Sequence, residues 1–207
     1  MIYNINRLRY KSKNEKLSEK DKSILQSRIK EPKSYEHITE IFGRNKAVNQ
    51  VNKLRLNDLK TKLYTVKARH IPKERKVKIN EDGTIENTSF FDILHLKEGA
   101  RVMLISNINT TDKLVNGVQG IIQNILSDEQ GQVRYVIVSF DNKSVGKEQK
   151  HKFKFLNRII NLKDGVPIER VNITYTLGNI KKNHGAKAAF LQLPLKLSWS
   201  ITSHKVI

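Results

Sequence analysis

The 207-residue chain contains no cysteine. Disulfide bonds, thiolate nucleophiles and cysteine-ligated zinc are therefore excluded. No apolar run approaches the roughly 18 residues that a membrane-spanning helix needs. The start of the chain, Met1 to Tyr10, also lacks the apolar core of a signal peptide. These absences predict an intracellular protein that makes no membrane contact.

Acidic residues are scarce relative to basic ones. The sequence has 20 aspartates and glutamates against 39 lysines and arginines, which gives a formal net charge of +19. The excess is spread along the chain, without the low-complexity run that marks a disordered cationic tail. A polyanion is therefore the first partner to consider, ahead of the alternative of a lysine-biased proteome in which surface positions drift towards lysine.

The chain also lacks the motifs of a self-sufficient catalyst. No G-x-x-x-x-G-K-[ST] phosphate loop occurs, and no apolar run ends in a pair of acidic residues that could hold Mg²⁺. The six histidines are too dispersed to form a local metal-ligand cluster, and no serine lies in a nucleophile elbow. We therefore expect no independent catalysis by this chain.

The first part of the sequence shows helical patterns. Ser18 and Asp21 resemble a capping box at the start of a polar helix. A short strand at 41–42 precedes a second helix, whose apolar residues recur at spacings of three and four. The turn at Arg44 and Asn45 is either a phosphate-binding helix start or an ordinary connection with Asn45 as the N-cap.

Beyond residue 90 the pattern changes to short strands. Apolar segments at 101–108, 118–126 and 132–140 predict strands, and the last two read as a hairpin. Further strands are predicted at 152–160 and 166–175. This number of short strands indicates a small barrel or sandwich. The dipeptide Asn116-Gly117 predicts a turn with positive φ. Trp199 is either an aromatic residue of the core or one that stacks on a base.

Four blocks of residues occur in a fixed order along the chain. They are LSEKDKSILQSR (17–28), IFGRNKAVNQVN (41–52), GARVMLISN followed by LVNGVQG (99–120), and QLPLKLSWSITSHK (192–205). Together they resemble the Pif (petite integration frequency) family of DNA helicases, in particular the helicase part of Helitron transposons. Family members continue the last block as HKSQG, whereas this chain ends with Lys205-Val206-Ile207.

The resemblance implies a fold that is α/β plus all-β. Residues 1–95 would form a partial RecA-like second motor domain, with a helical start, a strand–turn–helix at 41–60 and a polar connection at 70–89. Residues 96–192 would form an inserted small β-barrel of the Src-homology-three-like type. Residues 193–207 would be a truncated return into the motor domain.

The resemblance also implies where nucleic acid binds. In relatives, the segment that corresponds to Thr202, His204 and Lys205 grips the phosphates of single-stranded DNA. The turn at Arg44 and Asn45 falls where the family approaches the DNA backbone. No catalytic, cofactor-binding or metal-binding residue is expected in this chain. ATP and Mg²⁺ belong to the complete enzyme, whose first motor domain would be supplied in cis or by another chain.

The resulting hypothesis is a fragment of an ATP-dependent 5′–3′ DNA helicase that is inactive alone. The family implies DNA unwinding in repair, recombination and telomere maintenance or in Helitron transposition, in the nucleus or the mitochondrion. Two alternatives are a non-enzymatic module that binds single-stranded nucleic acid and a β-barrel that binds proteins. The oligomeric state is not predicted.

Overall fold

The computed structural model describes residues 18–27, 39–72, 77–176 and 187–202. The chain divides into two units, Met1–Ile38 and Thr39–Ile207, which we describe separately. In the first unit the described part is one helix, α2 (Glu19–Gln26). Within the described ranges, no helix has both the length and the apolar character needed to cross a membrane.

Helix α2 begins at the predicted capping box. The hydroxyl oxygen of Ser18 accepts a hydrogen bond from the Asp21 backbone N–H at 3.2 Å, and the Ser18 backbone N–H donates to Asp21 Oδ2 at 3.2 Å. This reciprocal pair satisfies backbone donors that the first helical turn leaves free. The predicted helix start at Ser18 is confirmed.

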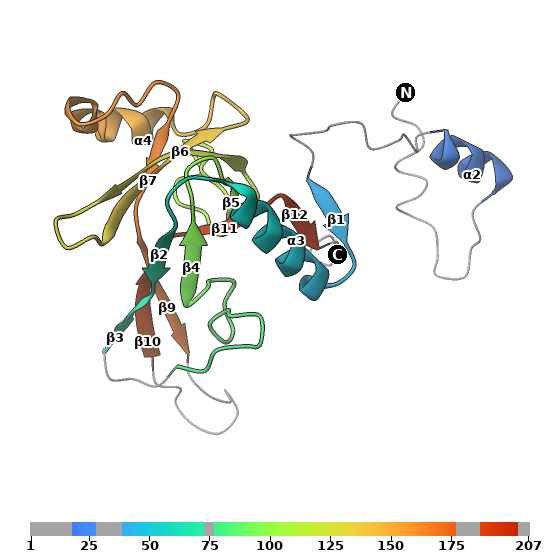
Figure 1. The fold of residues 1–207 in the computed structure, drawn as a ribbon, viewed down its shortest axis with the longest axis horizontal. Coiled ribbons are helices and arrows are strands. Elements are labelled where there is room, and N and C mark those ends of the chain that lie inside the picture. The colour runs from blue at the N-terminus through green and yellow to red at the C-terminus, as the bar shows by residue number, and fades with distance from the viewer. Residues whose placement is uncertain (1–17, 28–38, 73–76, 177–186, 203–207) are drawn as a thin grey trace. The chain divides into compact units, whose positions relative to one another are not determined.

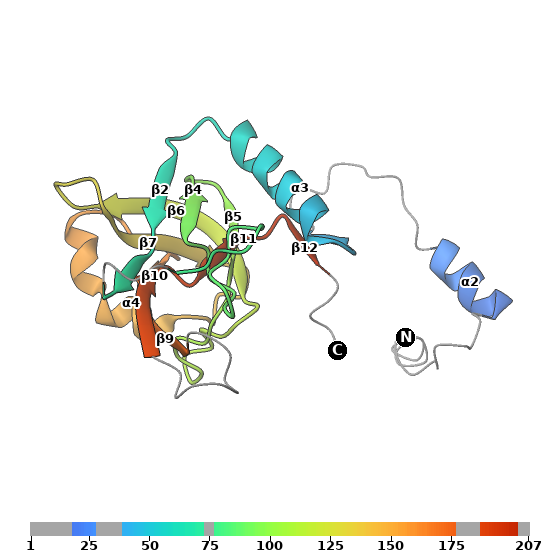
Figure 2. The same cartoon turned by 90° about the horizontal axis from the view of Figure 1, so that it is seen from below.

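The second unit begins and ends with a small parallel α/β element. Strands β1 (Glu40–Phe42) and β12 (Ser200–Thr202) pair in parallel, although they lie at opposite ends of the unit. Helix α3 (Asn45–Asp58) follows β1 and lies beside both strands (Figures 1 and 2). The predicted strand–turn–helix at 41–60 is therefore confirmed.

Antiparallel strands make up most of the rest of this unit. A two-stranded sheet and a five-stranded sheet share one apolar core, and a three-stranded sheet covers a second one (Figure 1). In sheet order the strands are β2 (Tyr64–Lys67) and β4 (Ile93–Leu96); β11 (Leu195–Leu197), β5 (Arg101–Leu104), β6 (Gln119–Ser127), β7 (Val133–Phe140) and β8 (Val166–Ile168); and β3 (Arg69–Ile71), β10 (Lys187–Gln192) and β9 (Val171–Thr176).

In the LVNGVQG block, two positions require glycine because of the local backbone geometry. Gly117 has φ of 97°, which confirms the predicted positive-φ turn. Gly120 lies where β6 runs so close to its antiparallel neighbour β7 that a Cβ atom at this position would be 2.5 Å from the Ser139 carbonyl oxygen. The predicted hairpin is also confirmed, because β6 and β7 pair through residues such as Ile122 and Val138.

The predicted strand at 152–160 is wrong. The chain there forms a short helix, α4 (Lys147–Lys152), and a 3₁₀ turn, η1 (Lys154–Arg158). The N-terminus of α4 is held by a distant carboxylate: Asp112 Oδ1 accepts from the backbone N–H of Glu148 at 3.0 Å, and its Oδ2 accepts from that of Gln149 at 2.8 Å. A cap that comes from 36 residues upstream leaves no local signal.

Trp199 is partly buried against the main core, which confirms the prediction of a core aromatic. The predicted domain boundaries stay predictions. Strands β2 and β3, which lie within the predicted motor segment 1–95, pair with β4 and β10. Of these two partners, β10 lies wholly within the predicted insertion 96–192.

Candidate nucleic-acid interface

The carboxyl ends of the two parallel strands lie at the same edge of the small sheet. Phe42, the last residue of β1, pairs with Thr202, the last residue of β12. The chain leaves β1 through Gly43 and Arg44 and enters α3 at Asn45. Parallel pairing therefore brings Thr202 to the edge at which α3 begins, although 157 residues separate it from Asn45 in the sequence (202 − 45).

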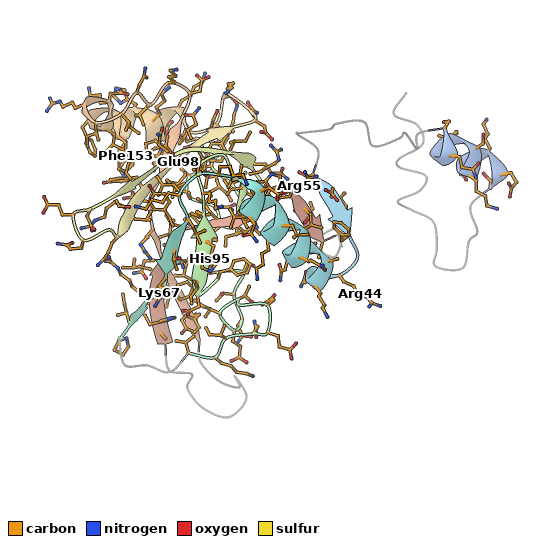
Figure 3. The ribbon with its side chains drawn as sticks, in the orientation of Figure 1. Arg44, Arg55, Lys67, His95, Glu98 and Phe153 are labelled. Carbon is orange, nitrogen blue, oxygen red and sulfur yellow. The ribbon has the colours of Figure 1, made fainter. Side chains whose placement is uncertain are left out.

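The start of α3 lacks the features that would neutralise its positive end. Arg44 is the N-cap residue, with extended backbone angles, and its side chain makes no capping hydrogen bond. The first turn contains no acidic residue. The N–H groups of this turn and the helix dipole therefore favour an anion. Arg44 is exposed, and its side chain extends away from the fold (Figure 3).

A buried asparagine fixes β12 against α3. The side chain of Asn52 is 6% exposed. Its Nδ2 donates to the Ser200 carbonyl at 3.0 Å, and its Oδ1 accepts from the Ser200 backbone N–H at 2.9 Å. The Ser200 hydroxyl in turn donates to the Val48 carbonyl at 3.1 Å. These bonds position the strand that carries Thr202.

A second polar network joins this element to the five-stranded sheet, which forms much of the predicted barrel. Arg101 Nη2 donates to Asp141 Oδ2 at 2.7 Å and to Gln119 Oε1 at 3.0 Å. The same Gln119 oxygen accepts from the Thr39 hydroxyl at 2.8 Å, one residue before β1. The Arg101 carbonyl accepts from the Ser198 backbone N–H at 2.9 Å, shortly before β12. Both strands of the candidate edge are therefore tied to β5 and β6.

Comparisons with known proteins agree with this architecture. A family model described as "DNA helicase Pif1, 2B domain" matches residues 89–125, which include β4, β5 and most of β6. The ATP-dependent DNA helicase Pif1 of Campylobacter jejuni is 30% identical over 168 residues, which cover 81% of this chain and 33% of the relative. Over most of its length the chain is therefore similar to Pif1 helicases.

Solved Pif1 structures share the fold. The Bacteroides Pif1 complex with ADP-AlF4 aligns with a TM-score of 0.58 at 22% identity, over 91% of this chain and 36% of that one. The Candida albicans Pif1 helicase aligns with a TM-score of 0.56 at 17% identity, over 91% of this chain and 41% of that one. Bacteroides Pif1 bound to single-stranded DNA gives 0.55 at 23% identity, again over 91% of this chain and 36% of that one.

These matches confirm the predicted family resemblance and the predicted fold class, a partial RecA-like α/β domain with a barrel-like insertion. The chain spans about a third of the length of the Pif1 relatives, since it covers 33% to 41% of them. Their activity and ligands are therefore taken up below as proposals for this chain.

The predicted site residues divide into two groups. Arg44, Asn45 and Thr202 are brought to one edge by the Pif1-type α/β element. His204 and Lys205 lie outside the described residues. The alternative of Asn45 as the N-cap is wrong, because Arg44 occupies that position and Asn45 is the first helical residue.

The sequence-based prediction missed the residues that position this edge. Asn52 stands at the end of the IFGRNKAVNQVN block, and the resemblance alone was the signal that could have singled it out. Arg101 belongs to the next block and is nearly buried, with 7% of its surface exposed. A buried arginine needs an acidic partner, and Asp141 could not be identified from the sequence.

A group of arginines on the barrel was also missed. Arg170 Nη1 donates to the Lys67 carbonyl at 2.8 Å. Burial lowers the pKa of Arg170, and the nearby charges of Arg69 and Arg134 lower that pKa further. An arginine remains charged at neutral pH despite such shifts, so this group adds to the positive charge of the barrel.

No metal centre emerges from the described part of the chain. Across those ranges, no group of three or more histidine, aspartate and glutamate side chains is placed to hold a metal ion.

Proposed function

We propose that this chain is the part of an ATP-dependent DNA helicase that holds a single strand of DNA at the edge formed by β1, β12 and the start of α3. The observation that carries the proposal is the meeting of Arg44, Asn45 and Thr202 at this edge. Two Bacteroides Pif1 structures with the same fold hold single-stranded DNA, which supports the choice of ligand.

The chemistry of the edge suits a phosphodiester. The Arg44 guanidinium offers a charged, forked donor, and the first N–H groups of α3 point outward beside it. The Thr202 hydroxyl can donate a hydrogen bond to the same DNA phosphodiester backbone. By resemblance, His204 and Lys205 continue this contact. These groups bind phosphate and carry no base-specific readout, as a translocating enzyme requires.

Movement along the strand needs a nucleotide site that this sequence does not encode by itself. The Pif1 relatives are named as ATP-dependent, and one solved relative holds ADP-AlF4. We propose that the complete enzyme uses ATP and Mg²⁺ in a cleft between two motor domains. The networks of Asn52 and Arg101 would then transmit closure of that cleft to the strand-holding edge and the barrel. The 5′–3′ direction, the cellular process and the organelle stay predictions from the resemblance.

The test compares two arginines on one helix. Arg44→Gln removes a cation from the start of α3, whereas Arg55→Gln removes one from its last turn, where Arg55 lies 3.5 Å from Glu40. Fluorescence anisotropy with an oligo-dT strand should show weaker binding for Arg44→Gln. The log–log salt slope of that variant should also be less steep by about 0.7, the value for one lost phosphate contact on a single strand.

The Arg55→Gln control should bind like the unaltered chain. Equal affinities and slopes for the two variants would remove Arg44 from the site. Salt-independent or absent binding by the unaltered chain would favour the alternative of a protein-interaction barrel. Tight binding would instead favour a non-enzymatic binding module if no first motor domain with a phosphate loop is encoded together with this chain.

A further inference from the structure

The segment formed by α4 and η1, residues 147–159, presents two very different faces. On the inner face, Phe153 and Leu156 are 5% and 2% exposed and pack with Ile137. On the outer face, Phe155 is 50% exposed and Ile159 is 68% exposed. The labelled Phe153 marks where this segment sits on the barrel in Figure 3.

The outer face is strongly basic. The α4–η1 segment contains five cations and a single carboxylate, that of Glu148, so its formal charge is 5 − 1 = +4; the cations are Lys147, Lys150, Lys152, Lys154 and Arg158. Within the part of the chain that the structure describes, only Lys152 among them lies within ion-pair distance of a carboxylate, 3.7 Å from Glu169. For the other four cations, no carboxylate of the described residues lies within ion-pair distance.

The combination of exposed apolar residues and cations on this face favours single-stranded nucleic acid over a protein as the ligand. A protein interface of ordinary composition is depleted in lysine at its apolar centre. Single-strand binders instead combine cations that follow the phosphates with aromatic rings on which bases stack. The Phe155 ring lies beside that of Phe153, with ring centroids 5.9 Å apart and planes tilted by 47°, and its exposed half is accessible to a base.

A shallow pocket opens beside the same segment. Its volume is about 620 Å³ and its lining is largely polar; the residues include Asn107, Asn109, Thr110, Gln149 and Lys152. Amide and hydroxyl groups of this kind can hydrogen-bond to the edge of a base. The pocket, which Glu169 and Arg170 also line, adjoins the basic surface of the α4–η1 segment.

We propose that the α4–η1 segment is a second contact for single-stranded nucleic acid, in which Phe155 stacks on a base while Lys154 and Arg158 contact neighbouring phosphates. The proposal rests on the proposed function, since it assigns another part of the chain to the same ligand. It adds a contact on the barrel that is separate from the β1–β12 edge.

The first test separates stacking from charge. Phe155→Leu keeps an apolar side chain but removes the ring, whereas Phe155→Tyr keeps the ring. Base–aromatic stacking lost on substitution corresponds to a drop in affinity of about 5-fold or more. We expect Phe155→Leu to bind an oligo-dT strand at least about 5-fold more weakly, while Phe155→Tyr binds within about 2-fold of the unaltered chain.

The second test addresses the phosphates. Lys154→Gln and Arg158→Gln should each make the salt slope less steep by about 0.7. Lys60→Gln, which alters an exposed lysine between α3 and β2, should leave the slope unchanged. Photocrosslinking to a strand that carries 5-iodouracil should mark the tryptic peptide Phe155–Arg158. Circular dichroism verifies that each variant is folded.

The outcomes distinguish this inference from the proposed function. If Arg44→Gln weakens binding while the variants at Phe155, Lys154 and Arg158 all bind normally, the second contact is wrong and the first stands. Equal losses for Phe155→Leu and Phe155→Tyr would also overturn the stacking role. If the unaltered chain does not bind oligo-dT at low salt, both proposals fail.

Discussion

Asn52 shows how one side chain can replace a missing strand. Its amide both donates to and accepts from the backbone of Ser200, as a neighbouring strand would do. Among the strands that the structure describes, β12 pairs with one partner, β1. The amide of Asn52 therefore satisfies backbone groups that are buried on the side facing α3.

Replacing this asparagine should destabilise the second unit. Asn52→Ala leaves the buried N–H and C=O of Ser200 without their partner, which costs about 1–3 kcal/mol per unsatisfied group. Urea unfolding should therefore show a lower midpoint for Asn52→Ala than for the control Asn49→Ala, an exposed position on the same helix. Equal midpoints would show that the amide does not hold β12.

At the scale of elements, α4 depends on a residue outside its own sequence. Asp112 accepts hydrogen bonds from two N–H groups in the first turn of α4, and its carbonyl accepts one from Gly146 at 2.9 Å. The carboxylate also opposes the positive end of the helix dipole. The loop that contains Asp112 thus holds the start of the basic α4–η1 segment in place.

Removal of this cap should loosen α4 selectively. Asp112→Ala should lower the stability of the fold by about 1–2 kcal/mol, the usual cost of a lost N-cap. Hydrogen exchange should become faster at the α4 amides of residues 148–152. Asp164→Ala removes an equal charge from an exposed carboxylate and should leave that exchange rate unaltered; equal effects would contradict the role of Asp112.

The elements that could be predicted are those with local signals. Ser18 and Asp21 lie three residues apart, and the β6–β7 hairpin joins neighbouring segments, so both were readable from the sequence. The alternation of Lys152, Phe153, Lys154 and Phe155 has the period of a strand, which explains the wrong prediction there. The segment forms α4 and η1 instead, because Asp112 caps the start of α4 and Leu156 is buried in the core.

Local patterns indicated the turn at Arg44 and Asn45 as a candidate phosphate site, but Thr202 could be added to that site only through the family resemblance. Arg44 and Thr202 meet because β1 and β12 pair in parallel across most of the chain, and no local pattern reports a pairing of that range. The resemblance carried Thr202 into the prediction as part of a block. It did not reveal the Asn52 and Arg101 networks, since these depend on which side chains become buried.

At the scale of the whole molecule, the binding of DNA and movement along it depend on different parts of a helicase. A helicase hydrolyses ATP between two motor domains, and both sides stabilise the transferred phosphoryl group. The sequence contains no phosphate loop. We therefore expect the purified chain to show no ATP turnover above background, with or without single-stranded DNA, in a coupled phosphate-release assay. DNA-stimulated turnover would contradict this division of roles.

Single-stranded DNA is proposed to bind this chain through contacts between the DNA phosphates and basic side chains. The most direct measurement is the affinity of the unaltered chain for oligo-dT across a series of salt concentrations. With two or more phosphates neutralised, we expect a log–log slope of about −1.4 or steeper, at about −0.7 for each contact. A slope near zero, or no binding at low salt, would contradict it.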